Sequence, residues 1–161
     1  MIRERPEPED ETDRRLMSKI DQHGWAILHV GAGRSPDEPS FSYTAGIWET
    51  LDKPELLLFN LQFDLAAAII NNYANRSKSE RFVPGARYSG FLKVFDVVFV
   101  EVDYRRACGE HTRWTDWYYR RQGFPLLQLM WPANGNGTFP WDQDFPKDFL
   151  SAQPVLGSLP H

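Results

Sequence analysis

This chain has little cysteine, no long apolar run and no excess of basic charge, and each of these features excludes a class of protein. Its 161 residues include one cysteine, Cys108, so an internal disulfide framework is excluded and a reducing compartment is expected. No segment approaches about 18 uninterrupted apolar residues, and the charged N-terminal residues lack the apolar stretch of a signal peptide. We therefore expect a cytoplasmic protein that does not contact a membrane.

Basic residues number 18 against 22 acidic ones, which gives a formal net charge of −4 at pH 7. Binding to a phosphate backbone usually needs a basic surface, so nucleic acid is not a partner that the composition favours. Aromatic residues are abundant instead, at 14% of the chain with 6 Trp and 11 Phe. Aromatic side chains either fill a core or line a recognition surface.

The domain organisation follows from where apolar residues begin. Residues 1–12 carry many charges and prolines and have little to bury, which predicts a flexible charged leader. Residues 13–161 have the length and composition of a single domain with its own core.

The order of the predicted elements indicates an α+β domain. Apolar spacing predicts helices over 13–23, 63–76 and 112–122, and β-rich composition predicts strands over 25–30, 41–48, 55–61, 90–103 and 126–131. We expect a mixed or antiparallel central sheet of about five strands with about three helices packed against it. Gly24 is expected to end the first helix, Thr112 to cap the third, and Asp96 to place a bulge or bend in the long fourth strand.

The residues that could carry chemistry do not assemble a recognisable motif. Gly31 and Gly33 follow a strand, but the remaining glycine of a dinucleotide fingerprint is missing, so a turn is predicted. Cys108 and His111 are residue types that bind zinc, as is His23, yet zinc needs three or four converging ligands and this spacing is not specific for them. We predict no cofactor.

The third predicted helix combines arginines with aromatic residues. Trp114, Trp117 and Tyr118 recur at helical spacing, which favours a core-facing stripe, while Arg113 and the pair Arg120–Arg121 fall on the remaining arc. Stacking on RNA bases remains an alternative. A basic patch for an acidic protein partner is the functional interpretation that we keep.

Four segments of the chain form a recognisable series: His23-Gly24-Trp25, the stretch 41–48 with Pro54-Glu55 soon after, the strand at 126–132, and the turn at 139–142 followed by Gln153-Pro154. Together they resemble a bacterial family of unknown function, the DUF4262 family. The family pattern falls on His23, Gly24, Trp25, Tyr43, Thr44, Gly46, Pro54, Glu55, Gln128, Trp131, Pro132, Phe139, Pro140, Trp141 and Gln153. Members of the family commonly have an aspartate where this chain has Ala133, so an activity that needed this carboxylate would be absent here.

A second, weaker similarity is to suppressor-of-fused-like domains, which include bacterial immunity proteins. It rests on the order strand, helix, proline-glycine loop and strand between 55 and 131. This similarity favours a role in protein recognition.

Two functional hypotheses follow. The first is a non-catalytic domain that binds another protein, as an immunity or accessory factor beside a toxin or modifying enzyme, with Trp25, Trp131 and Trp141 among its binding residues. The alternative is a small-molecule-binding protein or enzyme with a pocket formed by His23, Tyr43, Thr44 and Gln128, in which His23 is the general acid or base.

Overall fold

The computed structural model describes residues 4–133 and 137–158 of the chain. Six strands form one sheet: β1 (Ala26–Val30), β2 (Phe41–Ala45), β3 (Glu55–Phe59), β4 (Arg87–Tyr88), β5 (Val97–Val102) and β6 (Leu126–Met130). Their order across the sheet is β1-β2-β3-β6-β5-β4. β3 and β6 run parallel and all other neighbours are antiparallel, so the sheet is mixed and the α+β prediction is confirmed.

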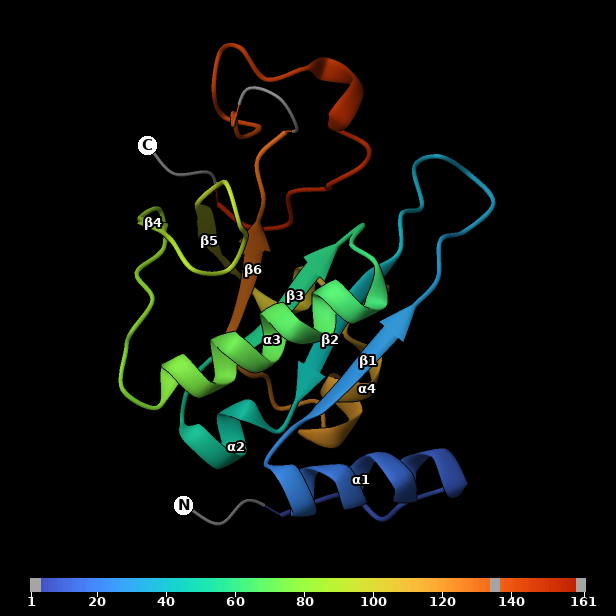
Figure 1. Cartoon of the computed structure of the whole chain (residues 1–161). Coiled ribbons are helices and arrows are strands. Elements are labelled where there is room, and N and C mark those ends of the chain that lie inside the picture. Colours follow the sequence, from blue (N-terminus) through green and yellow to red (C-terminus); the bar gives the residue numbers. More distant parts are fainter. Residues whose placement is uncertain (1–3, 134–136, 159–161) are drawn as a thin grey trace.

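Helices cover both faces of this sheet (Figure 1). They are α1 (Glu11–His23), α2 (Ile47–Leu51), α3 (Phe63–Ser77) and α4 (Arg113–Tyr118), with 3-10 turns η1 (Tyr104–Arg106) and η2 (Lys147–Phe149). α3 lies across one face, while α1 and α4 pack on the other. No helix in the described part of the chain is both long and apolar enough to cross a membrane.

The central strand β3 shows why the core has two halves. Leu56 and Leu58 pack with the residues of α3, whereas Leu57 and Phe59 pack with those of α1 and α4. All five residues of β3 are buried, as expected for a strand that is covered on both faces. The predicted aromatic stripe of α4 also faces this second half of the core.

All five predicted strands were longer than the observed ones, and two of them differ by three residues or more. The segment 41–48 is a strand only to Ala45, because Gly46 adopts a left-handed conformation and the chain then turns into α2. The segment 90–103 becomes a strand at Val97, directly after Asp96. Gly90, at a φ of 89°, begins a bent loop that turns the chain before the strand, so the prediction of one long bulged strand was wrong.

The helix boundaries also differ in part from the predictions. Gly24 ends α1 in a left-handed conformation with φ 97° and its N–H donates to the carbonyl of Ile20, as predicted. α1 begins at Glu11, where the Asp10 side chain accepts a hydrogen bond from Asp13 N. α4 ends at Tyr118, earlier than predicted, and Thr112 precedes it without a capping bond from its side chain.

In the N-terminal segment before α1, the side chains of Glu4 and Arg5 contact the domain. The Glu4 carboxylate accepts a hydrogen bond from Arg120. Arg5 donates to the carboxylate of Glu49 on α2, at 2.7 and 3.2 Å, and to that of Asp21 on α1. These side chains are partly exposed, so each pair contributes a small stabilisation. The contact joins the leader to both helices.

Candidate functional site

A cleft of about 670 Å³ lies between α1 and α3, beside the edge strand β1. Ten residues line it: Lys19, Gln22, His23, Trp25, Ala26, Ile27, Phe63, Asn71, Asn75 and Lys78. We call this space the α1–α3 cleft. It contains two of the residues that the sequence singled out, His23 and Trp25.

Helical spacing brings the polar side chains of this cleft together. Lys19 and His23 are four residues apart and therefore share one face of α1. Asn71, Asn75 and Lys78 follow at offsets of four and three along α3 and its C-terminal end. Gly24 turns the chain sharply after α1, so Trp25 lies directly before β1 and lines the cleft.

The indole of Trp25 is held from two sides. Its Nε1 donates to Oδ1 of Asn71 at 3.0 Å, and the ammonium of Lys78 lies 5.9 Å from the centre of its ring. A cation at this distance from a tryptophan face is weakly attracted to it. The tryptophan is therefore a preformed, half-buried wall of the cleft.

The charge of the α1–α3 cleft is opposite to that of the whole chain. Lys19, Lys78 and His23 line it together with three side-chain amides, and no carboxylate is among its lining residues. The chain as a whole carries a formal net charge of −4. A local basic surface on an acidic protein attracts an anionic group in preference to a cationic one.

A buried carboxylate occupies the start of β3 and has a structural role. Glu55 is fully buried, and its oxygens accept hydrogen bonds from five donors. The donors are the hydroxyl of Thr44 at 2.8 Å, the backbone N–H groups of Gly46, Ile47 and Trp48 at 3.0 to 3.1 Å, and the hydroxyl of Tyr119.

Burial and hydrogen bonding shift the pKa of the Glu55 carboxyl group in opposite directions. Burial raises the pKa of Glu55, and the hydrogen bonds from Tyr119 and the α2 backbone oppose that rise. Burial together with the charge of Glu55 also raises the pKa of Tyr119. Since three of its donors are the first backbone amides of α2, Glu55 serves as the cap of that helix.

Tyr43, Thr44 and Gln128 do not line the cleft that contains His23. Their side chains are buried, and their polar atoms are bonded within the chain. Tyr43 accepts from Trp114 N at 3.3 Å, and Thr44 accepts from Leu56 N at 2.9 Å while it donates to Glu55. The structure therefore does not bring the four residues of the predicted pocket together.

Gln128 and the tryptophans at the C-terminal end hold the tail against the sheet. The Gln128 side chain donates to the carbonyl of Pro154 and accepts from Leu156 N at 2.9 Å. The Gln153 side chain bonds both the N–H and the carbonyl of Trp131, each at 2.8 Å. Trp141 stacks on Phe139 with ring centres 5.0 Å apart.

Cys108 and His111 lie in the loop before α4. The imidazole of His111 packs edge-on against Phe41 and Phe59, with ring centres 4.9 and 5.0 Å apart, and burial lowers its pKa. Burial raises the pKa of the Cys108 thiol, the direction that disfavours a reactive thiolate. Among the residues that the structure describes, no group of three or more His, Cys, Asp or Glu side chains is placed to hold a metal ion.

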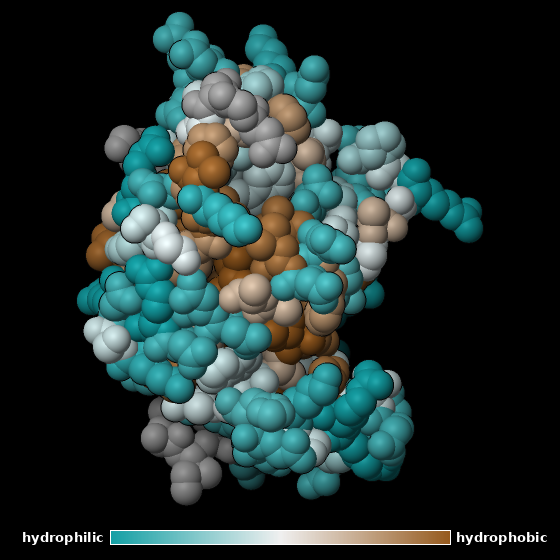
Figure 2. Space-filling view, viewed as in Figure 1, coloured by the Kyte–Doolittle hydropathy of each residue, from teal (hydrophilic) through white to brown (hydrophobic). Residues whose placement is uncertain are grey.

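A separate hollow of about 400 Å³ is mainly apolar. Its lining includes Leu61, Leu65, Leu92, Phe95 and Trp131. Figure 2 shows hydrophobic residues gathered near the middle of the face that α3 covers, with hydrophilic residues around them. Among the described residues of the lining, Asn60 is the one with a polar side chain besides Trp131, and the Trp131 Nε1 already donates to Phe59 O at 2.8 Å. The hollow thus has little with which to orient a ligand.

Of the polar residues that line the α1–α3 cleft, the sequence did not single out five: Lys19, Gln22, Asn71, Asn75 and Lys78. The signal available for them was helical spacing, which places each set on one face of its own helix. Spacing within a helix does not reveal which other helix that face meets.

Comparison with protein families matches residues 19–146 to a family described as Domain of unknown function (DUF4262). No curated protein and no solved structure matches the chain. Nothing in these comparisons supports the similarity to suppressor-of-fused-like domains.

Proposed function

The chain belongs to the DUF4262 family, whose function is unknown, and from its own geometry we propose that it is a non-catalytic domain that binds an acidic segment of another protein in the α1–α3 cleft. In this role it would serve as an accessory or immunity factor for the protein that it binds. The observation that carries the proposal is the lining of the cleft, which has two lysines, a histidine, three amides and no carboxylate.

The shape of the surroundings supports a protein ligand. β1 is the first strand in the sheet order and pairs with β2 on one side. Its residues Ala26 and Ile27 line the cleft. A strand edge of this kind can accept an extended segment through its backbone groups, while Lys19 and Lys78 reach acidic side chains of that segment.

Trp25 supplies the apolar part of the recognition. Tryptophan is enriched among the residues that dominate protein interfaces, because it combines a large apolar area with a polar N–H group. Here Asn71 holds the indole in place, so binding loses little side-chain freedom at this position.

Charge reversal on the two helices tests the proposal. The double variant Lys19→Glu, Lys78→Glu changes two exposed side chains, so folding should be preserved. We expect affinity purification from the native host to recover a stoichiometric partner with the original chain and not with this variant. The matched control is Arg34→Glu, Lys93→Glu, which reverses two exposed charges outside the cleft and should retain the partner.

The same partner should bind through a segment rich in Asp and Glu, with an affinity that falls as salt concentration rises. Equal recovery of the partner by the two double variants would contradict the proposal. So would a cleft that binds free inorganic phosphate or a small carboxylate but no protein, since this outcome assigns the basic lining to a small anion.

A further inference from the structure

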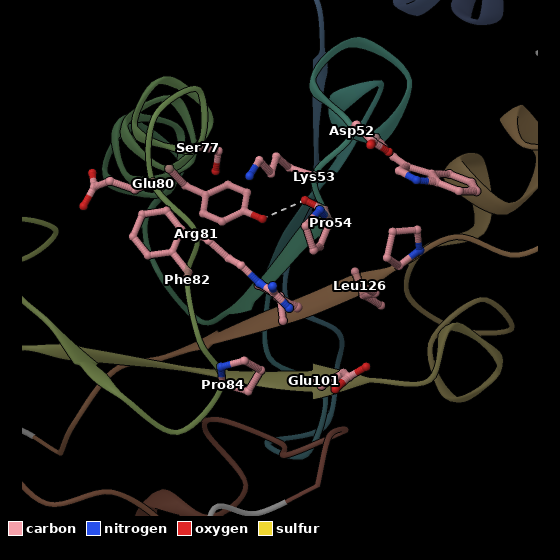
Figure 3. Close-up of a pocket in the computed structure, with 14 residues that line it drawn as sticks. Asp52, Lys53, Pro54, Ser77, Glu80, Arg81, Phe82, Pro84, Glu101 and Leu126 are labelled. Carbon is pink, nitrogen blue, oxygen red and sulfur yellow. Dashed lines mark hydrogen bonds between the residues drawn. The ribbon is translucent and has the colours of Figure 1, made fainter. Parts of the chain in front are cut away.

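A second pocket, of about 470 Å³, lies at the opposite end of α3 from Phe63, and no functional residue had been predicted there. We call it the β3–β5 pocket. Its lining comes from the α2–β3 connection, the C-terminal end of α3, the loop after α3, the end of β5 and the start of β6 (Figure 3). The volume is within the range of small-molecule sites.

Aromatic and proline side chains make the walls of this pocket. Trp48, Tyr73 and Phe82 line it together with Pro54, Pro84 and Pro125. The hydroxyl of Tyr73 donates to the carbonyl of Pro54 at 2.8 Å, which joins α3 to the α2–β3 connection across the pocket. Rigid walls of this kind preform a space for an apolar group.

Charged side chains of both signs also line the β3–β5 pocket. Glu80 is engaged by Arg76, with hydrogen bonds of 2.8 and 3.1 Å. Asp52, Lys53, Arg81 and Glu101 have no side-chain hydrogen bond or ion pair with any other residue in the described ranges 4–133 and 137–158. Figure 3 shows Arg81 extending toward the middle of the pocket, with Glu101 and Asp52 on different sides of it.

From these features we infer that the β3–β5 pocket binds a free amino acid with a large apolar side chain. An amino acid carries one carboxylate and one ammonium, which match the cations and carboxylates of the lining that have no side-chain partner in the described part of the chain. The guanidinium of Arg81 can bind the carboxylate through two parallel hydrogen bonds. Glu101 is the partner for the ammonium. The half-buried ring of Trp48 contacts the side chain of the amino acid together with the prolines of the lining, since Tyr73 and Phe82 are only 1% and 7% exposed and pack in the core.

The mixed charge distinguishes this ligand from a polyanion. Two carboxylates that have no side-chain partner among the described residues, Asp52 and Glu101, would repel a nucleotide or a polyphosphate. The inference does not rest on the proposed protein partner, because the β3–β5 pocket and the α1–α3 cleft share no lining residue.

Calorimetric titration of the full chain with L-phenylalanine tests the inference, with two analogues that each lack one charge. These are 3-phenylpropionate, without the ammonium, and 2-phenylethylamine, without the carboxylate. We expect phenylalanine to bind, and each analogue to bind at least about tenfold more weakly, the factor that corresponds to about 1.4 kcal/mol. Arg81→Ala and Glu101→Ala should each weaken phenylalanine binding by a similar factor.

Arg34→Ala is the matched control, because Arg34 is an exposed arginine outside the pocket. It should bind phenylalanine as the original chain does. Arg81 and Glu101 are exposed, so their variants should unfold at the same temperature as the original chain. The inference is overturned if millimolar phenylalanine does not bind, if either analogue binds as well, or if Arg81→Ala leaves the affinity unchanged.

Discussion

Replacement of Glu55 by glutamine should destabilise the protein strongly, although the two side chains are almost the same size. A glutamine accepts hydrogen bonds at one oxygen, whereas Glu55 accepts at two. The best orientation places the amide oxygen where it can still accept from Gly46 N, Trp48 N and Tyr119. The amide nitrogen then faces the N–H of Ile47, which lies 3.1 Å from the carboxylate oxygen that it replaces.

The cost of this change follows from the bonds that are lost. A buried N–H group without an acceptor costs about 1–3 kcal/mol. The remaining bonds lose the charge of the carboxylate, and hydrogen bonds to ionised groups are roughly twice as strong as neutral ones. The amide also avoids the burial of a charge, so we expect a net loss of about 2–4 kcal/mol in the free energy of unfolding.

Thermal and urea unfolding, followed by circular dichroism, measure this loss. Each kcal/mol lost from the free energy of unfolding lowers the Tm of a domain of this size by about 2–4 °C, so Glu55→Gln should lower the Tm by roughly 4–16 °C. The control is Glu38→Gln in the exposed β1–β2 loop, which should change stability by less than about 0.5 kcal/mol. A loss below about 1 kcal/mol for Glu55→Gln would refute the argument that this carboxylate holds α2.

Three further substitutions test other contacts. His111→Phe should stabilise the protein more at pH 5 than at pH 8, as measured by urea unfolding. Burial lowers the His111 pKa from 6.5. Below that pH the unfolded state of the original chain therefore takes up a proton more readily than the folded state does, and the original chain loses stability. Gln153→Ala removes both hydrogen bonds to the Trp131 backbone and should cost about 1–3 kcal/mol, with faster amide exchange at that tryptophan. Gly46→Ala places a Cβ 2.9 Å from the carbonyl oxygen of Gly24 at a φ of 105°, and its Tm should fall by an amount that corresponds to about 1–3 kcal/mol. The first expectation fails if His111→Phe leaves the pH dependence of stability unchanged, and the second if Gln153→Ala leaves the amide exchange rate unchanged. An unchanged Tm for Gly46→Ala would contradict the third.

Elements with a regular apolar period could be predicted well from the sequence. α3 was predicted because Leu65, Ile69, Ile70 and Tyr73 recur at helical spacing. The last three are buried in the core, whereas Leu65 is 42% exposed. The end of α1 was predicted because glycine adopts the left-handed conformation that Gly24 has. Both signals are local, since each depends on residues of one segment.

α2 could not be predicted in the same way. Its five residues have no polar side chain at the capping position, which is occupied by Gly46. The cap comes instead from Glu55, nine residues after Gly46, and from a different element. An isolated helix of this length is not stable, so its existence depends on a contact that forms when the chain folds.

In the candidate site, too, single residues could be predicted from local sequence, whereas contacts between elements could not. His23 and Trp25 were singled out, and both line the α1–α3 cleft. Gln128, which was expected to share a pocket with His23, does not line this cleft, because it lies in β6 and its side chain bonds the C-terminal tail. The packing of the whole sheet decides which residues of two helices or two strands meet. The residue pattern within one segment does not predict these contacts.

The position of Glu55 has a consequence for the order of folding. The carboxylate that holds the first amides of α2 reaches them when β3 has paired with β2. The helix should therefore form after this hairpin, as a late event on the folding pathway, even though it precedes β3 in the chain.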